Sequence, residues 1–517
     1  MPPRKRGVRP PTLGEAMRAR REAMKARVER IRLERIEPIL ARFPRLLPTA
    51  PDSAAKYAIV SSIVWFAVGL LMALLLAVKL VFPRLLASYP WMSYGRLAGA
   101  EAAVLTWGVL FTGFAGAMFV IVPRLTGTKL WSERVGAQTI MLHDQVMLAG
   151  IVLLLIGRTQ GISGLELPWP IDILIVNSLL MVMQNVVATI ARRRERRLAP
   201  PLWYFLAAVI VLPVTYAFGN FAAPFSYGVN QQIVAGFAIA GTMTGMMMLG
   251  VGTAYYVLPK ATGRPIYSER VALIGFWTLV FAAPWTGQIQ AILGPGQDYL
   301  ETVAITFAVW LLIPALCVLV NFWGTLRDAW DKAVSDPAVK FVVGGTLFLL
   351  VGTTLLGMGS LRSMQDAVGH TPWDIATDTA LAGGLGFFLI ALIYHQFPRM
   401  IGRVLYSARW GTRQFWAQSF GLAVAVASMA IAGVIQGDLQ IAGIKTATPV
   451  SAGTKWYVIT QAIRPFFIIR IVGGALVALG LFIFVANLLR TVTLGEDAEA
   501  EPPHFVEPER EPVGVGA

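Results

Sequence analysis

Apolar segments long enough to cross a lipid bilayer recur along almost the whole chain. A helix that spans the hydrocarbon core needs about 20 mostly apolar residues, and twelve segments of the sequence reach that length. Polar connections separate them, so the pattern predicts an all-α polytopic membrane protein with twelve transmembrane helices. The segments are residues 56–80, 98–122, 138–157, 170–191, 202–218, 229–258, 270–293, 300–324, 340–360, 375–397, 413–436 and 467–490.

Two polar regions of opposite charge flank the apolar segments. Residues 1–53 are basic: residues 1–45 alone hold fourteen Lys and Arg against five Glu. They are predicted to form a helical extension, followed by the transmembrane domain over residues 54–492. Residues 493–517 are acidic and rich in proline. This composition is typical of a disordered tail.

The distribution of basic residues predicts the orientation. Connections 124–137, 192–201, 259–269, 325–339 and 398–412 carry Arg and Lys, whereas most of the alternate connections carry one basic residue or none. Basic loops stay in the cytoplasm, which places both termini there. An even number of spans agrees, because it brings both ends of the chain to one side of the membrane.

The basic extension is a candidate contact surface. Apolar residues recur in it at helical spacing between clusters of arginine, a pattern typical of a helix that lies on an anionic membrane leaflet or on an acidic partner. A solvated helix is the alternative, and nucleic acid is not a predicted partner. The candidate contact residues are Arg18, Arg20, Arg21, Lys25 and Arg27.

Composition excludes several classes of protein and of site. A chain that is 56% hydrophobic is not an ordinary water-soluble domain. Cys317 is the only cysteine, which excludes internal disulfides, covalent c-type haem attachment and cysteine-based metal sites. The chain has four histidines, His143, His370, His395 and His504, and only His143 and His395 lie in apolar stretches.

Several motifs resemble subunit I of the haem-copper oxidase superfamily, in its cbb-type (C-type) branch, which neighbours the nitric oxide reductases. The strongest is the stretch from Tyr255 to Ser268, supported by the segments 94–97, 167–174 and 398–407, in family order and at near-family spacing. The resemblance covers most of residues 90–436. It implies the family's twelve-helix bundle, a bacterial inner membrane, and an activity of cytochrome c oxidase or nitric oxide reductase.

The resemblance also implies six histidine ligands, which this chain cannot supply. In the family the second span gives one His to haem and the tenth gives two, while the sixth and seventh spans give three to copper. The corresponding positions here hold Glu101, Ile239, Ile289 with Gln290, and residues 376–379, none of which is His. Haem b and copper are therefore predicted to be absent, with no catalytic or metal-binding residue.

Glu101 is the most informative residue inside the predicted membrane domain. An ionisable group at membrane depth is a functional candidate by default, here for a proton or cation, or for an ion pair that fills the vacated haem cavity. The structural alternative is a protonated or paired carboxylate whose surroundings have refilled that cavity, because cavities cost stability. The candidate polar site comprises Glu101, Gln290, Asp378 and Arg362.

Three functions from different classes remain after the sequence analysis. The first is a non-redox accessory subunit of a respiratory or electron-transfer complex, which contacts lipid and other membrane or cytochrome c-type subunits and is not catalytic on its own. The second is a conduit for protons, ions or a small solute through the vacated haem cavity. The third is an active oxidase or nitric oxide reductase with unusual ligands.

Overall fold

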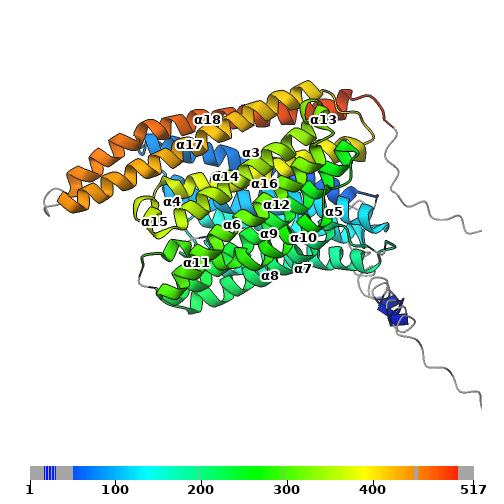
Figure 1. Cartoon of the computed structure of the whole chain (residues 1–517), viewed down its shortest axis with the longest axis horizontal. Helices are drawn as coiled ribbons and strands as arrows, with labels where there is room; N and C mark the ends of the chain where they lie inside the picture. Colours follow the sequence, from blue (N-terminus) through cyan, green and yellow to red (C-terminus); the bar gives the residue numbers. More distant parts are fainter. Residues whose placement is uncertain are drawn as a thin grey trace, which may run out of the picture.

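The computed structural model describes residues 17, 19–20, 22–24, 26–27, 30, 50–162, 164–195, 197–294, 296–446 and 452–498. For residues 290, 291, 443–446 and 452–455 it describes the backbone alone. Twelve helical segments in these ranges are long and apolar enough to cross a membrane. The predicted fold class, an all-α bundle of twelve transmembrane helices, is confirmed (Figure 1).

Eight spans are single helices, the last of them the long helix α18, and four are composite. The single helices are α3 (Ser53–Val81), α6 (Glu133–Leu155), α7 (Trp169–Ala191), α9 (Val229–Thr262), α14 (Pro337–Ser360), α16 (Pro372–Met400), α17 (Ala408–Thr446) and α18 (Ala452–Leu494). The second span joins α4 (Tyr94–Ala103), the π-helix η3 (Val104–Phe111) and α5 (Thr112–Thr126). The others are α8 (Pro200–Ala222) with η4 (Ala223–Phe225), α10 (Glu269–Ala282) with η5 (Ala283–Ala291), and α11 (Asp298–Trp310) with α12 (Leu312–Leu326).

The second and tenth spans form the centre of the bundle. Every residue of α5 from Thr112 to Pro123 is buried, and so is every residue of α16 from Phe387 to Pro398. A helix that is apolar and buried all round belongs inside a bundle rather than against lipid. Short helices cap the ends of the bundle: η2 (Pro90–Met92), α13 (Trp330–Ser335) and α15 (Arg362–Val368).

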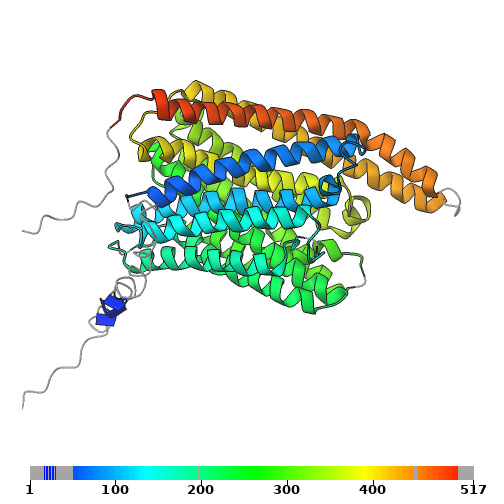
Figure 2. The same ribbon diagram turned by 180° about the vertical axis from the view of Figure 1, so that it is seen from behind.

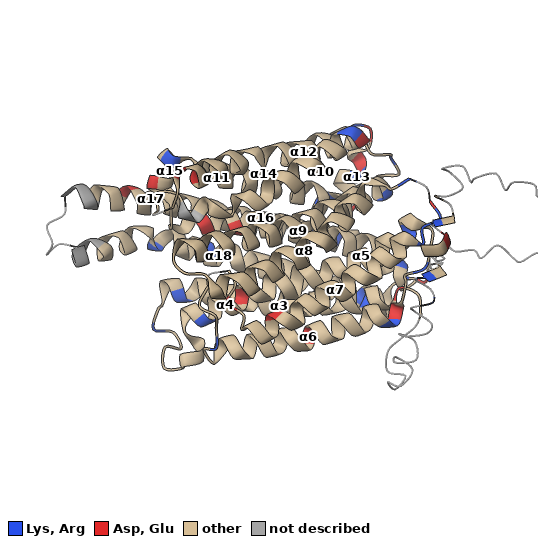
Figure 3. Ribbon diagram, turned by 90° about the horizontal axis from the view of Figure 1, so that it is seen from below, with Lys and Arg blue, Asp and Glu red and all other residues tan. Residues whose placement is uncertain are grey.

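Charged residues gather at the two ends of the bundle, and few lie in its middle (Figure 3). The first span begins, and the last span ends, at the same end of the bundle (Figure 2). This is the arrangement that twelve antiparallel spans require. Below, this end is called the terminal end and the opposite one the distal end. That the terminal end faces the cytoplasm stays a prediction.

A buried asparagine fixes the loop between the sixth and seventh spans at the terminal end. The Asn321 side chain accepts from Ser268 N at 2.9 Å and donates to Ser268 O at 2.9 Å. It also donates to the Tyr255 hydroxyl at 3.1 Å. One turn further, the Thr325 hydroxyl accepts from Tyr267 N at 3.1 Å. Two side chains of α12 thus bind the backbone of the residues that start α10.

We call this arrangement, in which an Asn and a Thr side chain bind the backbone before the preceding helix, an asparagine clamp. Similar clamps occur at two other places in the bundle. Each copy pairs an Asn-x-x-x-Thr segment at the end of one span with an aromatic-Ser pair that starts the preceding one. Repeated contacts of this kind hold consecutive spans in register without using residues at membrane depth. The copies are Asn185 with Ser132 and Thr189 with Trp131, and Asn487 with Ser407 and Thr491 with Tyr406.

The last two spans are longer than the sequence pattern predicts. The connection expected over residues 437–466 is mostly helical, because α17 continues to Thr446 and α18 starts at Ala452. The two helices cover each other along this extension: Ile459 and Ile463 of α18 are each only 6% exposed. At 1.5 Å per residue α17 is about 60 Å long, about twice the hydrocarbon thickness. Figure 1 shows the resulting hairpin projecting beyond the other helices.

The polar ends of the chain are described only in part. The acidic tail was predicted to be disordered over residues 493–517, and this stays a prediction. Its first residues contact the loop after the tenth span: Val404 N donates to Glu496 O at 2.9 Å, and Arg403 pairs with Asp497 at 3.1 Å. Residues 499–517 lie outside the described ranges. In the basic extension Arg20 and Arg27 are helical and exposed. Arg18, Arg21 and Lys25 lie outside the described residues, and the contact role of all five stays a prediction.

Candidate functional site

The positions that the resemblance assigns to copper ligands hold aliphatic side chains. Ile239 packs towards the loop before the fourth span, where a Cβ on Gly164 would lie 2.5 Å from its Cδ1. Ile289 lies in η5 and is partly buried. Neither side chain has a lone pair to offer a metal, so these residues do not fit the copper site that the resemblance implies. Within the described ranges no three or more His, Cys, Asp or Glu converge as a metal site would require.

The sixth and seventh spans meet backbone to backbone beside these positions. A Cβ on Gly236 of α9 would lie 2.2 Å from the carbonyl oxygen of Gly287 in η5. A Cβ on Gly287 would in turn lie 2.0 Å from the carbonyl oxygen of Gly236. Only glycine at both positions allows this approach.

The two histidines inside the bundle are engaged in local contacts. His143 is fully buried, its Nε2 lies 3.2 Å from the carbonyl oxygen of Trp107 in the π-helix, and its ring packs against Phe111. The same oxygen also accepts from the Thr112 hydroxyl at 3.1 Å. His395 lies near the terminal end of α16, where Arg399 Nη1 is 2.7 Å from its Nδ1. Both lie where the sequence predicted, in the third and tenth spans.

An open hollow runs along the distal half of α16. The Asp378 side chain is exposed, although the following half of the same helix is buried. One turn further in, Ala382 is partly exposed, and a Cβ added to Gly386 would meet nothing within 4 Å. We call this space, bounded by Asp378, Ala382 and Gly386, the α16 hollow.

The second span forms the opposite wall of the α16 hollow. The same side of α16 contacts that span just beyond Gly386, where the Leu389 Cδ2 atom would lie 2.3 Å from a Cβ on Gly113. This contact closes the hollow towards the terminal end. On the second span, nearer the distal end than this contact, Glu101 is partly buried and Ala102 is exposed. The functional and the structural interpretation of Glu101 both stay predictions.

Charged groups from three spans lie near the α16 hollow. Glu101 of α4 lies within electrostatic range of Arg470 of α18 and of Asp378 of α16. Neither carboxylate forms a hydrogen bond or ion pair with any residue in the described ranges. The buried Nη1 of Arg470 likewise has no hydrogen-bond partner there.

The candidate polar site predicted from the sequence is thus divided. Glu101 and Asp378 come together, but Arg362 lies on the short helix α15 and pairs with Glu301 at 3.3 Å, which corrects its predicted place beside Glu101. Gln290 belongs to η5, and its side chain lies outside the described parts of the chain. Sequence reasoning missed Arg470. Its signal was an arginine inside the twelfth apolar segment, whose other charged residue, Arg490, stands at the segment's end.

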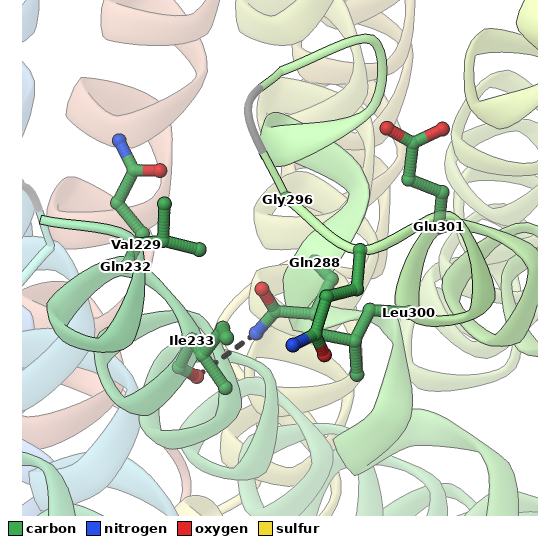
Figure 4. Close-up of a pocket in the computed structure, with 8 residues that line it drawn as sticks. Val229, Gln232, Ile233, Gln288, Gly296, Leu300 and Glu301 are labelled. Atoms are coloured by element: carbon green, nitrogen blue, oxygen red, sulfur yellow. Dashed lines mark hydrogen bonds between the residues drawn. The ribbon is translucent and has the colours of Figure 1, made fainter.

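Glu301 belongs to a separate small pocket at the distal end of α9 and η5. The pocket is lined by Gln232, Gln288, Gln297 and Glu301, among others (Figure 4). Gln288 Nε2 donates to Ile233 O at 2.9 Å, and Glu301 accepts from Leu293 N at 3.0 Å. Gln288 and Glu301 therefore already have partners in the protein, which is typical of structural polar groups.

Comparison with known proteins places the fold and the site in a family. The family described as "Cytochrome C and Quinol oxidase polypeptide I" matches residues 53–476. A cbb3-type cytochrome c oxidase subunit, CcoN1, of Stutzerimonas stutzeri is 27% identical over 87% of this chain and 98% of its own length. A cytochrome c oxidase subunit 1 homolog of Bradyrhizobium diazoefficiens is 26% identical over 88% of this chain and 84% of its own.

A solved structure agrees at the level of the fold. A haem-copper terminal oxidase dimer, studied by cryo-electron microscopy, contains a chain that superposes with a TM-score of 0.69 at 14% identity, over 87% of this chain and 86% of that one. The twelve spans, the motifs and the match over more than four hundred residues lead to one assignment. The chain is a multi-pass bacterial membrane protein that belongs to the haem-copper oxidase subunit I superfamily, in its cbb3-type branch.

Proposed function

We propose that this chain is a non-redox, haem- and copper-free member of its superfamily that serves as an accessory membrane subunit of a respiratory complex. One observation carries the proposal: the ligand positions implied by the resemblance hold Glu101, Ile239 and Ile289 in place of histidine. Low-spin haem and copper sites depend on imidazole nitrogen. A carboxylate and two alkyl groups offer neither the neutral donor nor its orientation by a hydrogen-bonded second shell.

The surroundings of the remaining histidines support the proposal. His143 is enclosed by Trp107 and Phe111, and His395 by Arg399, so a cofactor would have to displace these contacts. At the copper positions the direct approach of Gly236 and Gly287 leaves the spans joined by backbone contact. The bundle is therefore held together by contacts of the chain itself.

The projecting α17–α18 hairpin supports an accessory role. Beyond the bundle it exposes three large side chains in succession: Trp456 is 56% exposed, Tyr457 66% and Val458 54%. Aromatic residues are enriched where proteins bind other proteins. Other membrane or cytochrome c-type subunits are the partners that we propose for this surface, and membrane lipid for the rest of the bundle.

The cofactor content of this chain, separated from its partner subunits in mild detergent, tests the proposal. We expect less than about one tenth of a non-covalent haem per chain, measured by pyridine haemochrome after acid-acetone extraction, which removes b-type haem. Elemental analysis of the same sample should find no copper. Stoichiometric b-type haem or copper would refute the proposal.

The α16 hollow favours a conduit as a second candidate function, since the distal half of this central span is partly open at Asp378, Ala382 and Gly386. The other half counts against it, because Leu389 meets Gly113 and all residues of α16 from Phe387 to Pro398 are buried. We expect liposomes that contain the chain to pass protons no faster than empty liposomes. Flux that Glu101→Gln abolishes would favour the conduit over the accessory subunit.

A further inference from the structure

A carboxylate lies at the centre of the third span and on the outer side of the bundle. Asp144 is the central residue of the 23-residue helix α6. Its side chain is partly exposed, and Met141 and Gln145 beside it are exposed. Carboxylates at membrane depth almost always face the interior of a bundle or a water-filled cavity. Asp144 therefore requires a partner that the chain itself does not supply at this surface.

The surface around Asp144 belongs to the helices α3 and α6, which contact each other. Figure 2 shows α3, in blue, at the front of the bundle. Large side chains on α3 are exposed every three or four residues, at Tyr57, Val60, Val64, Val68 and Leu71. On α6 the exposed Leu148 lies one turn beyond Asp144. An outward stripe of this kind meets either lipid or another transmembrane helix.

Two donors from α3 hold the carboxylate in place. The Ser61 hydroxyl donates to Asp144 Oδ1 at 2.7 Å, and Trp65 Nε1 donates to the same oxygen at 2.9 Å. Trp65 is itself fixed against the second span, where a Cβ on Gly108 would lie 2.9 Å from its Cγ. Tyr57, which lies within electrostatic range of the carboxylate, is neutral. Because a carboxylate has about four acceptor sites, Oδ2 can accept from a further donor.

Neither lipid nor a second copy of the chain supplies a positively charged donor at this depth. Lipids present only hydrocarbon at the centre of the bilayer. Residues 57–78 of α3 and 135–155 of α6 contain no Lys or Arg. Two copies that met face to face here would bring their Asp144 carboxylates together, which is unfavourable. The chemistry of the surface thus favours a different protein with a basic residue at membrane depth.

We infer that the Asp144 surface, formed by Asp144, Gln145, Val64 and Leu148, binds a transmembrane helix of a partner subunit that carries a Lys or Arg at its centre. The basic side chain donates to Asp144 Oδ2, and apolar side chains of the partner helix cover Val64 and Leu148. The Gln145 amide adds a polar group beside the ion pair, of the kind that joins helices within membranes. This surface is the exception to the lipid contact proposed above. The inference rests on the proposed function in one respect, that the chain assembles with other membrane subunits.

Two synthetic helices test the inference on the full chain, freed of partner subunits and reconstituted in phosphatidylglycerol vesicles. Both are leucine–alanine helices of about 22 residues. One has lysine at its centre, and the other has norleucine, which shares the carbon stem of lysine but lacks the ammonium group. We expect the lysine helix to bind at least about tenfold more tightly, measured by energy transfer between a dye on the helix and one on the chain. Equal affinities, or no binding by either helix, would overturn the inference.

Asp144→Asn locates the site, because asparagine keeps an oxygen that accepts from Ser61 and Trp65 but removes the negative charge. This variant should lose the preference for lysine and unfold near the temperature of the unmodified chain. Asp438→Asn, at an exposed carboxylate of α17, is the control and should keep the preference. A preference that survives Asp144→Asn would overturn the inference. Stoichiometric b-type haem in the same preparation would instead refute the proposed function and leave the Asp144 surface in place.

Discussion

Replacing Gly236 with alanine is expected to lower the stability of the bundle by about 3 kcal/mol, the upper part of the range for overpacked cores. The added Cβ would lie 2.2 Å from the carbonyl oxygen of Gly287 and 3.0 Å from the Gln288 side chain. A backbone oxygen cannot rotate away as a side chain can. The 3-10 helix η5 would therefore have to move away from α9, and it would lose its packing along that helix.

Thermal unfolding in detergent, followed by tryptophan fluorescence, measures this effect. Gly386→Ala is the matched control, because a Cβ there meets nothing within 4 Å. Alanine has the better helix propensity, so this control should be neutral or stabilising by up to about 1 kcal/mol. If Gly236→Ala unfolds at the same temperature as the unmodified chain, the sixth and seventh spans do not touch through their backbones.

The twelve spans were predictable because the bilayer imposes a minimum length of apolar sequence on each helix. The same reasoning failed for residues 437–466, which were predicted to be a connection but are mostly helical. A helix outside the bilayer can be stabilised by packing against another helix and does not need a continuous apolar surface. α17 and α18 cover each other there, through residues such as Ile459 and Ile463. Hydropathy reports on lipid contact and does not register such mutual burial.

The candidate site was only half predictable. Glu101 stood out because a carboxylate is rare at membrane depth, and the count of four histidines followed from composition alone. The residues that surround Glu101, by contrast, depend on which spans pack together in the folded bundle. Arg362 was expected nearby but pairs with Glu301, while Arg470, far away in the sequence, faces Glu101. The α16 hollow was unpredictable, because an unfilled space has no residue to represent it in the sequence.

The fold has supports that do not depend on a cofactor. Its second and tenth spans are wedged together at Gly113 and Leu389, and its sixth and seventh meet at Gly236. At the terminal end, three asparagine clamps tie consecutive spans through backbone hydrogen bonds. A bundle braced in this way can retain its architecture when the ligands of its interior change, provided that the clamps remain.

Asn321→Ala is therefore expected to destabilise the bundle by about 3 kcal/mol, because it removes three hydrogen bonds at once. Ser268 N would lose its acceptor, Ser268 O would keep only Ala272 N as a donor, and the buried Tyr255 hydroxyl would lose its donor. Thermal unfolding again measures the change. Asn177→Ala, at an exposed asparagine of α7, is the control and should shift the melting temperature little. Equal, small shifts for the two variants would mean that water replaces the clamp and that packing alone holds the loops in register.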